Sequence, residues 1–227
     1  SNIKHDGREG HWLEKQMGIT PNANNDADIF GFEMKKQTRA KTTFGDWSAD
    51  YYIFKDSKYK LDRDKEFLPI FGKANIKKGN RYSWSGEPCP NIHKHNDFGQ
   101  KLFVNNEEDI LALYSFSKDN RLDKDKVVPI QLRQENLIIA KWHKESLKNK
   151  LESKFNQKGW FRCEKNEQGI YISIAIGSPI SWEKWVAHVK TGEVYFDSGM
   201  YQGNKRNYSQ WRANNGFWDN LITQHID

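Results

Sequence analysis

Short runs of β-branched and aromatic residues, separated by polar turns, are the feature that most constrains the fold of this chain. Such runs, bounded by turn residues, are typical of strands. One of them, IFGFEMKKQT, also alternates, with Phe32 and Met34 on one face and Glu33 and Lys35 on the other. We predict strands over residues 29–38, 50–54, 66–72, 110–117, 137–142, 160–165, 171–177 and 193–197.

Helical spacing is rarer and occurs at isolated places. Leu147, Leu151 and Phe155 recur every four residues, which puts them on one face of a helix. A short helix is expected over Gly10–Met17, and Gly18 is placed to end it. Because strands outnumber helices, we predict a mixed α/β domain with a central sheet flanked by helices.

Two later segments are less regular. SWEKWVAHV, at 181–189, fits either a helix or a strand, and a last helix is expected near the end of 209–222. No linker divides the chain, so we expect one domain over residues 1–227.

The composition indicates a globular protein with a packed core. Charged residues make up 29% of the chain, and Trp, Tyr and Phe are plentiful, which argues against disorder. No apolar run approaches the roughly 20 residues of a membrane-spanning helix, so we expect a cytoplasmic protein with no membrane partner. Cys89 and Cys163 lack CxxC spacing, which argues against a zinc site and favours free thiols. The net charge of +6 suits a nucleic-acid partner, but it also suits ordinary solubility.

Asp28, Glu33 and Lys35 form the pattern Asp-x4-Glu-x-Lys at the first predicted strand. Residues two apart on a strand point the same way, so Glu33 and Lys35 project side by side, and Asp28 can fold back beside them. Two carboxylates make a hard oxygen site for Mg²⁺, which polarises a phosphodiester and lowers the pKa of bound water. A neighbouring ammonium can orient that water and offset phosphate charge. The three residues therefore match the needs of phosphodiester hydrolysis.

The same pattern also fits a solvated strand face, where Glu/Lys pairs two residues apart are common. Two neighbours favour a site. Gly31 lets another backbone or DNA approach the strand closely, and Glu14 lies on the preceding predicted helix, where it can point at the same place. Asp26 is an alternative ligand to Asp28, whereas Lys36 is expected on the opposite side of the strand.

Two sequence blocks extend this pattern. GREGHWLE and ADIFGFEMK together resemble G-x-x-G-x-x-L-E … D-x-x-G-x-E-x-K of the MutH-like branch of the PD-(D/E)xK nucleases. Within that branch they are similar to the MvaI/BcnI type of type II restriction endonuclease. A looser resemblance continues through KTTFGDWSADYYIF, and YFDSGMYQGNKRNYSQWRA is similar to the DNA-contacting C-terminal region of such enzymes. Ala27 stands where the family often has proline, which only stiffens the turn.

The resemblance implies a restriction-endonuclease-like core in a single domain, with a catalytic part at about 7–60 and a DNA-contacting part at about 195–220. Asp28 and Glu33 would bind Mg²⁺, which Mn²⁺ can replace. Lys35 would be the catalytic lysine, and Glu14 an accessory acid. The resemblance further implies an enzyme that cuts double-stranded DNA to 5′-phosphate and 3′-hydroxyl ends, with a cognate DNA methyltransferase as a potential partner. It favours a monomer, and a dimer is the alternative.

The segment between Ser198 and Trp218 has no acidic residue and interleaves cations with aromatic residues and asparagines. We predict a loop that enters a DNA groove, because arginine can pair with guanine, asparagine with adenine, and lysine with phosphate. The alternative is a solvated turn whose aromatic residues lie in the core. The candidate residues are Asn204, Lys205, Arg206, Asn207, Tyr208 and Arg212.

A second candidate loop lies in 80–101, where two prolines stiffen the chain. Its candidate DNA-contacting residues are Arg81, His93, Lys94 and His95. The alternatives are a plain surface loop, or a metal site made by the two histidines with Asp97.

We therefore predict a Mg²⁺-dependent, sequence-specific endonuclease of double-stranded DNA. The nearest alternative is a MutH-like nicking enzyme of mismatch repair, which has the same chemistry. An alternative of another class is a non-catalytic DNA-recognition domain of a larger restriction system, and the intact Asp28, Glu33 and Lys35 set argues against it. An RNA-processing enzyme is a weaker alternative.

Overall fold

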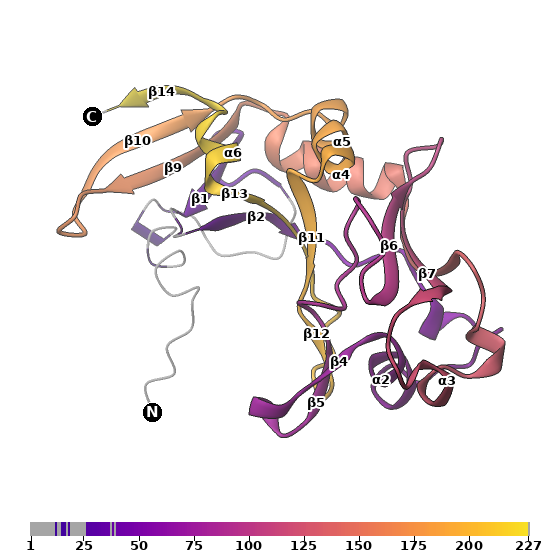
Figure 1. Ribbon diagram of the computed structural model, residues 1–227. Helices are drawn as coiled ribbons and strands as arrows, with labels where there is room; N and C mark the ends of the chain where they lie inside the picture. Colours follow the sequence, from indigo (N-terminus) through magenta and orange to yellow (C-terminus); the bar gives the residue numbers. More distant parts are fainter. Residues whose placement is uncertain are drawn as a thin grey trace. The chain divides into compact units, whose positions relative to one another are not determined.

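The computed structural model describes residues 12, 15–16, 18, 26–36, 38 and 40–226 (Figure 1). The chain forms two compact units that are interleaved along the sequence. The first unit takes in the chain up to Thr42, Asn149–Trp182 and the chain from Asn215 onward. The second unit takes in Thr43–Lys148 and Glu183–Asn214. The predicted catalytic part at about 7–60 therefore contributes residues to both units.

The first unit is built on a four-stranded sheet in the order β1-β9-β10-β14. β1 pairs in parallel with β9, and the other two pairs are antiparallel. Met34, Phe161 and Cys163 form a buried cluster on this sheet. The strands are β1 (Phe32–Lys36), β9 (Gly159–Lys165), β10 (Tyr171–Gly177) and β14 (Ile222–Ile226).

Two helices supply the rest of the first unit's core. α4 (Lys144–Phe155) enters this unit from the second one, and its last residue, Phe155, is fully buried. The rings of Phe155 and Trp160 pack against Trp218 of α6 (Asn215–Asp219), with centroids 6.0 and 5.1 Å away. α4 is thereby held in place at its C-terminal end.

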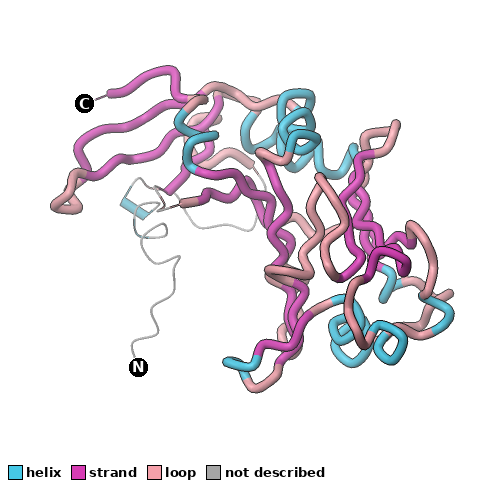
Figure 2. The backbone as a smooth tube through the Cα atoms, in the orientation of Figure 1, coloured by secondary structure: helices cyan, strands magenta, loops and turns pink. Residues whose placement is uncertain are grey.

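The described residues of the second unit form three sheets, in the orders β3-β8-β7-β6, β11-β13-β2 and β12-β5-β4. Figure 2 separates these strands from the long loops that join them. The strands are β2 (Lys41–Asp46), β3 (Tyr51–Tyr52), β4 (Lys73–Asn75), β5 (Arg81–Trp84), β6 (Phe98–Val104), β7 (Ile110–Asp119), β8 (Leu137–Trp142), β11 (Val194–Ser198), β12 (Met200–Tyr201) and β13 (Ser209–Asn214). The helices are α2 (Leu68–Phe71), α3 (Lys124–Val127) and α5 (Trp182–Thr191).

Large aromatic residues fill the core of the second unit. The ring of Trp211 lies 5.5 Å from that of Trp142 and 5.2 Å from that of Trp185, and the Phe196 ring lies 4.9 Å from that of Trp142. Trp211 is fully buried, so this aromatic residue of the predicted DNA-contacting segment has a structural role.

Most of the elements predicted from hydrophobic patterns are present, although strands β2, β4, β5, β6, β12, β13 and β14 were not predicted. The runs at 110–117, 137–142, 160–165, 171–177 and 193–197 are strands β7, β8, β9, β10 and β11. Residues 147–155 are helical, residues 181–189 lie largely in helix α5, and the last helix is α6. In the helix predicted at 10–17, residues 12, 15 and 16 are helical, and the others lie outside the described part of the chain.

The predicted strand at 66–72 is wrong, because this stretch is helical. A π-helical turn, η2 (Arg63–Phe67), runs directly into α2. The Asp62 carboxylate accepts hydrogen bonds from the backbone N–H groups of residues 64 and 65 and so caps the turn. Pro69 then falls in the first turn of α2, where its missing N–H costs nothing. A short apolar run does not by itself distinguish a buried strand from a buried helix.

Two other predictions need correction. The strand predicted at 50–54 ends at Tyr52, and Ile53–Lys55 form a 3-10 turn. The segment 198–218, predicted as a loop, contains strand β13, in which Ser209, Trp211 and Ala213 are buried and alternate with more exposed residues. This alternation is the period of two that a strand requires.

Neither Cys89 nor Cys163 is in a disulfide, which agrees with the prediction of thiols. Cys163 is buried in the sheet of the first unit, and burial raises its pKa. Among the described residues, no helix is long and apolar enough to cross a membrane.

Candidate active site

β1 carries two of the predicted catalytic side chains, and a tight turn aims it. Phe30 and Gly31 both adopt positive φ angles, 47° and 86°. The carbonyl oxygen of Gly31 accepts a hydrogen bond from the backbone N–H of Lys158, 3.0 Å away, which ties the turn to the residue before β9. A Cβ on Gly31 would lie 3.1 Å from Oε1 of Gln157, so glycine suits both the angle and the space.

Glu33 and Lys35 project to the same side of β1 and touch. Lys35 Nζ donates a hydrogen bond to Glu33 Oε1 over 2.8 Å. The two residues are only 3% and 8% exposed, and Lys35 Nζ lies 4.8 Å from the centre of the Phe155 ring. The solvated strand face considered above is therefore wrong. Two opposite charges are held inside the unit, where either one alone would be costly.

Asp28 folds back onto β1 from the preceding turn. Its Oδ2 accepts a hydrogen bond from the backbone N–H of Met34 over 2.8 Å. Burial raises the pKa of Asp28, and the negative charge of Glu33 raises it further, so the two carboxylates act on each other. Asp26, the alternative ligand, is exposed. Asp28 is therefore the better placed of the two aspartates.

Lys154 joins this site, and the sequence analysis missed it. It lies on α4, and its Nζ is 3.1 Å from Glu33 Oε1, with 19% of the side chain exposed. Lys154 falls three residues after Leu151, within the predicted apolar face of the helix. A lysine within an apolar helix face was the sequence signal that could have identified Lys154, because a buried charge needs a partner.

The two lysines set the charge state of Glu33. Burial alone would raise the pKa of Glu33, but the positive charges and hydrogen bonds of Lys35 and Lys154 lower it below its ordinary value. Burial lowers the pKa of Lys35, and the charge of Lys154 lowers it further, while Glu33 acts in the opposite direction. Glu33 is therefore held as a carboxylate although its side chain is buried.

The free oxygen of Glu33 fits a metal ion. Oε1 accepts from both lysines, whereas Oε2 is buried and has no hydrogen-bond partner among the described residues. A buried carboxylate oxygen without a partner is rare in native proteins and suits a cation. The described residues contain no group of three or more His, Cys, Asp or Glu set for a metal. Asp28 and Glu33 make a two-carboxylate set, which is typical for Mg²⁺ completed by water and phosphate. Glu14 lies outside the described residues.

The predicted DNA-contacting loop joins β12 to β13, and Arg63 holds it from η2. The Arg63 guanidinium donates to Asn207 Oδ1 over 2.7 Å and to the carbonyl oxygens of residues 201 and 206. Asp64, which is paired with Arg63, accepts from the backbone N–H of Gly203 over 2.8 Å. The loop therefore has a defined shape. The sequence did not show that Arg63 and Asp64 fix this shape.

The candidate residues of this loop differ in their surroundings. Lys205 is exposed, and Arg206 is exposed but lies 3.0 Å from Asp46. Asn204 is engaged within the loop, because its Nδ2 donates to the Tyr201 hydroxyl and its Oδ1 accepts from the backbone N–H of residue 206. Tyr208 is half-buried. Arg212 lies on β13, where it pairs with Asp197 over 3.0 Å.

The second candidate segment is split by the fold. Arg81 lies on β5, which pairs with β12, and its guanidinium stacks 3.7 Å from the Tyr201 ring centre. The structure thus brings Arg81 to the loop at 202–208. His93 and Lys94 are exposed in the turn before β6. His95 is half-buried, and burial together with the charges of two nearby lysines lowers its pKa. The metal site considered for His93, His95 and Asp97 is not formed.

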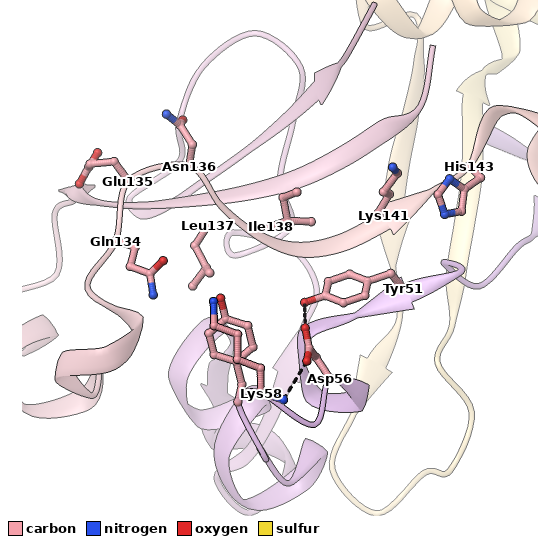
Figure 3. A pocket seen from close by; sticks show the side chains of 11 residues that line it. Tyr51, Asp56, Lys58, Gln134, Glu135, Asn136, Leu137, Ile138, Lys141 and His143 are labelled. Carbon is pink, nitrogen blue, oxygen red and sulfur yellow. Dashed lines mark hydrogen bonds between the residues drawn. The ribbon is translucent and has the colours of Figure 1, made fainter. Parts of the chain in front are cut away.

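A pocket of about 480 Å³ lies elsewhere in the second unit (Figure 3). Tyr51 projects into it, and its hydroxyl donates to Asp56 over 3.0 Å. Ile138, Lys141 and His143 from β8 and the residue after it face the same space. None of the predicted site residues lines this pocket.

Known proteins resemble this chain over its whole length. The family model described as LlaMI restriction endonuclease matches residues 1–226. The type II restriction enzyme ScrFI of Lactococcus lactis subsp. cremoris is 48% identical over 241 residues, covering 98% of this chain and 89% of that enzyme. The complex of restriction endonuclease MvaI with its cognate DNA substrate covers 100% of this chain and 90% of that one, with a TM-score of 0.62 and 12% identity. The structural likeness confirms the predicted restriction-endonuclease-like fold.

Proposed function

Because the chain belongs to the LlaMI restriction endonuclease family, we propose that it cuts double-stranded DNA at a specific sequence with Mg²⁺ held by Asp28 and Glu33. Its 48% identity to a type II restriction enzyme supports the type II class. The observation that carries the metal assignment is the buried Glu33 carboxylate, which has one oxygen on two lysines and the other without a partner.

Each side chain has a distinct task in this proposal. The metal would polarise the scissile phosphate and make its bound water more acidic. Glu33 Oε2 and the Asp28 carboxylate would hold that ion. Lys35, fixed by Glu33, donates a hydrogen bond to the attacking water or to a phosphate oxygen and offsets the charge that develops there. Lys154 is a positioning residue, because it holds Glu33 and fixes which oxygen stays free.

Further details come from the family resemblance. We propose 5′-phosphate and 3′-hydroxyl ends, replacement of Mg²⁺ by Mn²⁺, action as a monomer, and a cognate DNA methyltransferase that protects the host site. Lys205, Arg206 and Arg81 are the proposed contacts to DNA in the second unit, because they combine positive charge with a place on or beside the loop at 202–208.

The test compares Lys35→Ala with Lys36→Ala. Lys36 is its neighbour on the same strand and has the opposite side-chain direction. Wild-type protein and the Lys36 variant should cut phage DNA to discrete bands in Mg²⁺ and leave it intact in EDTA. Lys35→Ala should bind DNA in a mobility-shift assay and leave it uncut. Undiminished cutting by Lys35→Ala would contradict the assignment of the site.

The gel also separates the alternatives. With a supercoiled plasmid as the substrate, nicked circles without double-strand breaks would indicate a MutH-like nicking enzyme. Intact DNA in both Mg²⁺ and Mn²⁺, with binding retained, would indicate a recognition domain without catalysis.

A further inference from the structure

The β4–β5 hairpin ends in an exposed turn that the assigned sites do not use. The turn spans residues 75–80 and contains the 3-10 turn η3 (Ile76–Lys78), seen between β4 and β5 in Figures 1 and 2. All six residues are exposed. In sequence they read Asn-Ile-Lys-Lys-Gly-Asn, so the turn carries two positive charges and no negative one.

The backbone of this turn is well defined. Asn75 pairs with Arg81 at its base, and the N–H of Gly79 donates to the carbonyl of Ile76 over 3.3 Å. Gly79 and Asn80 adopt left-handed φ angles of 66° and 59°. Glycine and asparagine are the residues that take this conformation at least cost. The turn therefore presents its side chains from a fixed frame.

The turn and the proposed DNA-contacting loop belong to one small sheet. β5 pairs with both β4 and β12, and the loop at 202–208 follows β12. The backbone N–H of Tyr82 donates to Gln202 Oε1 over 2.7 Å, and the N–H of Gln202 donates to the Tyr82 carbonyl over 3.0 Å. The turn and the loop are therefore fixed to each other through β5.

Basic residues predominate on this sheet, although Lys73 pairs with Glu87 and Arg206 pairs with Asp46. Residues 73–84 and 199–208 contain six Lys or Arg residues and no Asp or Glu. Within the part of the chain that the structure describes, Lys77, Lys78 and Lys205 have no acidic side chain within ion-pair distance. A basic surface of this kind fits a polyanion, and phosphate contacts dominate the affinity of such surfaces for DNA.

Ile76 adds an apolar side chain directly before the two lysines of this turn. It is 84% exposed. A single exposed isoleucine is common on protein surfaces, but next to two lysines on a hairpin it matches a groove-binding element. A two-stranded ribbon fits the major groove, where apolar side chains contact thymine methyl groups.

We propose that the turn at 75–80 is a second DNA-contacting element, with Lys77 and Lys78 on phosphates and Ile76 against base edges in the groove. The inference rests on the proposed function, because it needs a duplex bound by the neighbouring loop.

The test measures the salt dependence of binding. The double variant Lys77→Gln/Lys78→Gln and wild-type protein bind a duplex containing the cleavage site, without Mg²⁺, at several salt concentrations. Each lost phosphate contact should lower the slope of log K against log salt by about 0.9, so the double variant should lose about 1.8 and bind at least tenfold more weakly at low salt. Ile76→Ser should weaken binding to the cognate duplex more than to a random one and leave the slope unchanged.

The matched control is Lys60→Gln/Lys126→Gln, which removes the same charge from exposed positions elsewhere in the second unit. The inference would be overturned if the Lys77→Gln/Lys78→Gln variant showed the same salt slope and the same DNA affinity as this control. Wild-type protein that fails to bind the duplex would overturn the proposed function as well, so the two failures are distinguishable.

Discussion

Two cationic clusters organise this protein, and they use their charges in opposite ways. Lys35 of β1 and Lys154 of α4 both donate to one oxygen of the Glu33 side chain, and the other oxygen has no partner among the described residues. Arg63 of η2 donates to two backbone carbonyls and to the side-chain amide of Asn207, at the loop at 202–208. The first cluster keeps a buried carboxylate charged. The second fixes the shape of the loop at 202–208, whose own lysine, Lys205, stays exposed.

The comparison predicts that disruption of the first cluster has the larger effect. Glu33→Gln leaves two lysines without their buried carboxylate, so cutting should be lost and the free energy of unfolding should fall by about 3 kcal/mol. Chemical unfolding followed by tryptophan fluorescence measures this loss. The control is Glu87→Gln, which removes an exposed partner of Lys73 and should cost less than about 1 kcal/mol. Equal losses for the two variants would contradict the role of burial.

Lys154→Met should have the next largest effect. Glu33 Oε1 keeps Lys35 but loses its second donor, so the carboxylate is held less firmly and single-turnover cleavage should slow by about 10- to 100-fold. Lys154→Arg should restore most of the rate, because it keeps the charge. Lys158→Met, at an exposed position just beyond α4, is the control and should cut normally. A Lys154→Met rate equal to that of the control would remove Lys154 from the site.

Arg63→Met should have the smallest effect, and on specificity rather than on chemistry. The loop loses the donor that bridges three of its groups, so the bound shape must be ordered at the cost of binding energy. Affinity for the cognate duplex should fall about tenfold, with a smaller change for a random duplex and little change in the cleavage rate at saturation.

Two variants sharpen this result. Arg63→Lys should not rescue it, since an ammonium lacks the planar fork that reaches several acceptors. Lys65→Met, exposed on the same turn, is the control. A proportional loss for cognate and random duplexes would show that Arg63 acts through general stability.

The part of the site on and before β1 was predictable because its residues are close together in the sequence. Asp28, Glu33 and Lys35 lie within eight positions, and a strand period of two puts the last two on one side. The helical pattern could mark Lys154 as a lysine that needs a partner, but it could not identify Glu33 as that partner, because the two residues are 121 positions apart in the sequence. The stretch 66–72 was mistaken for a strand because its apolar run fits either element. Its cap at Asp62 and its burial make it helical.

By itself, the sequence determined the periodic and chemical features: the strand faces, the order of Asp28, Glu33 and Lys35, and the acid-free basic segment near the C-terminus. It placed Gly31 inside the strand, whereas the strand begins at Phe32 and Gly31 lies in the turn before it. Only the tertiary structure decided that Glu33 and Lys35 are buried, that Lys154 is their third member, and that Arg63 shapes the loop. Periodicity encodes which side chains share a face. Desolvation and long-range ion pairing depend on which distant element covers that face, and they set the charge and reactivity of a site.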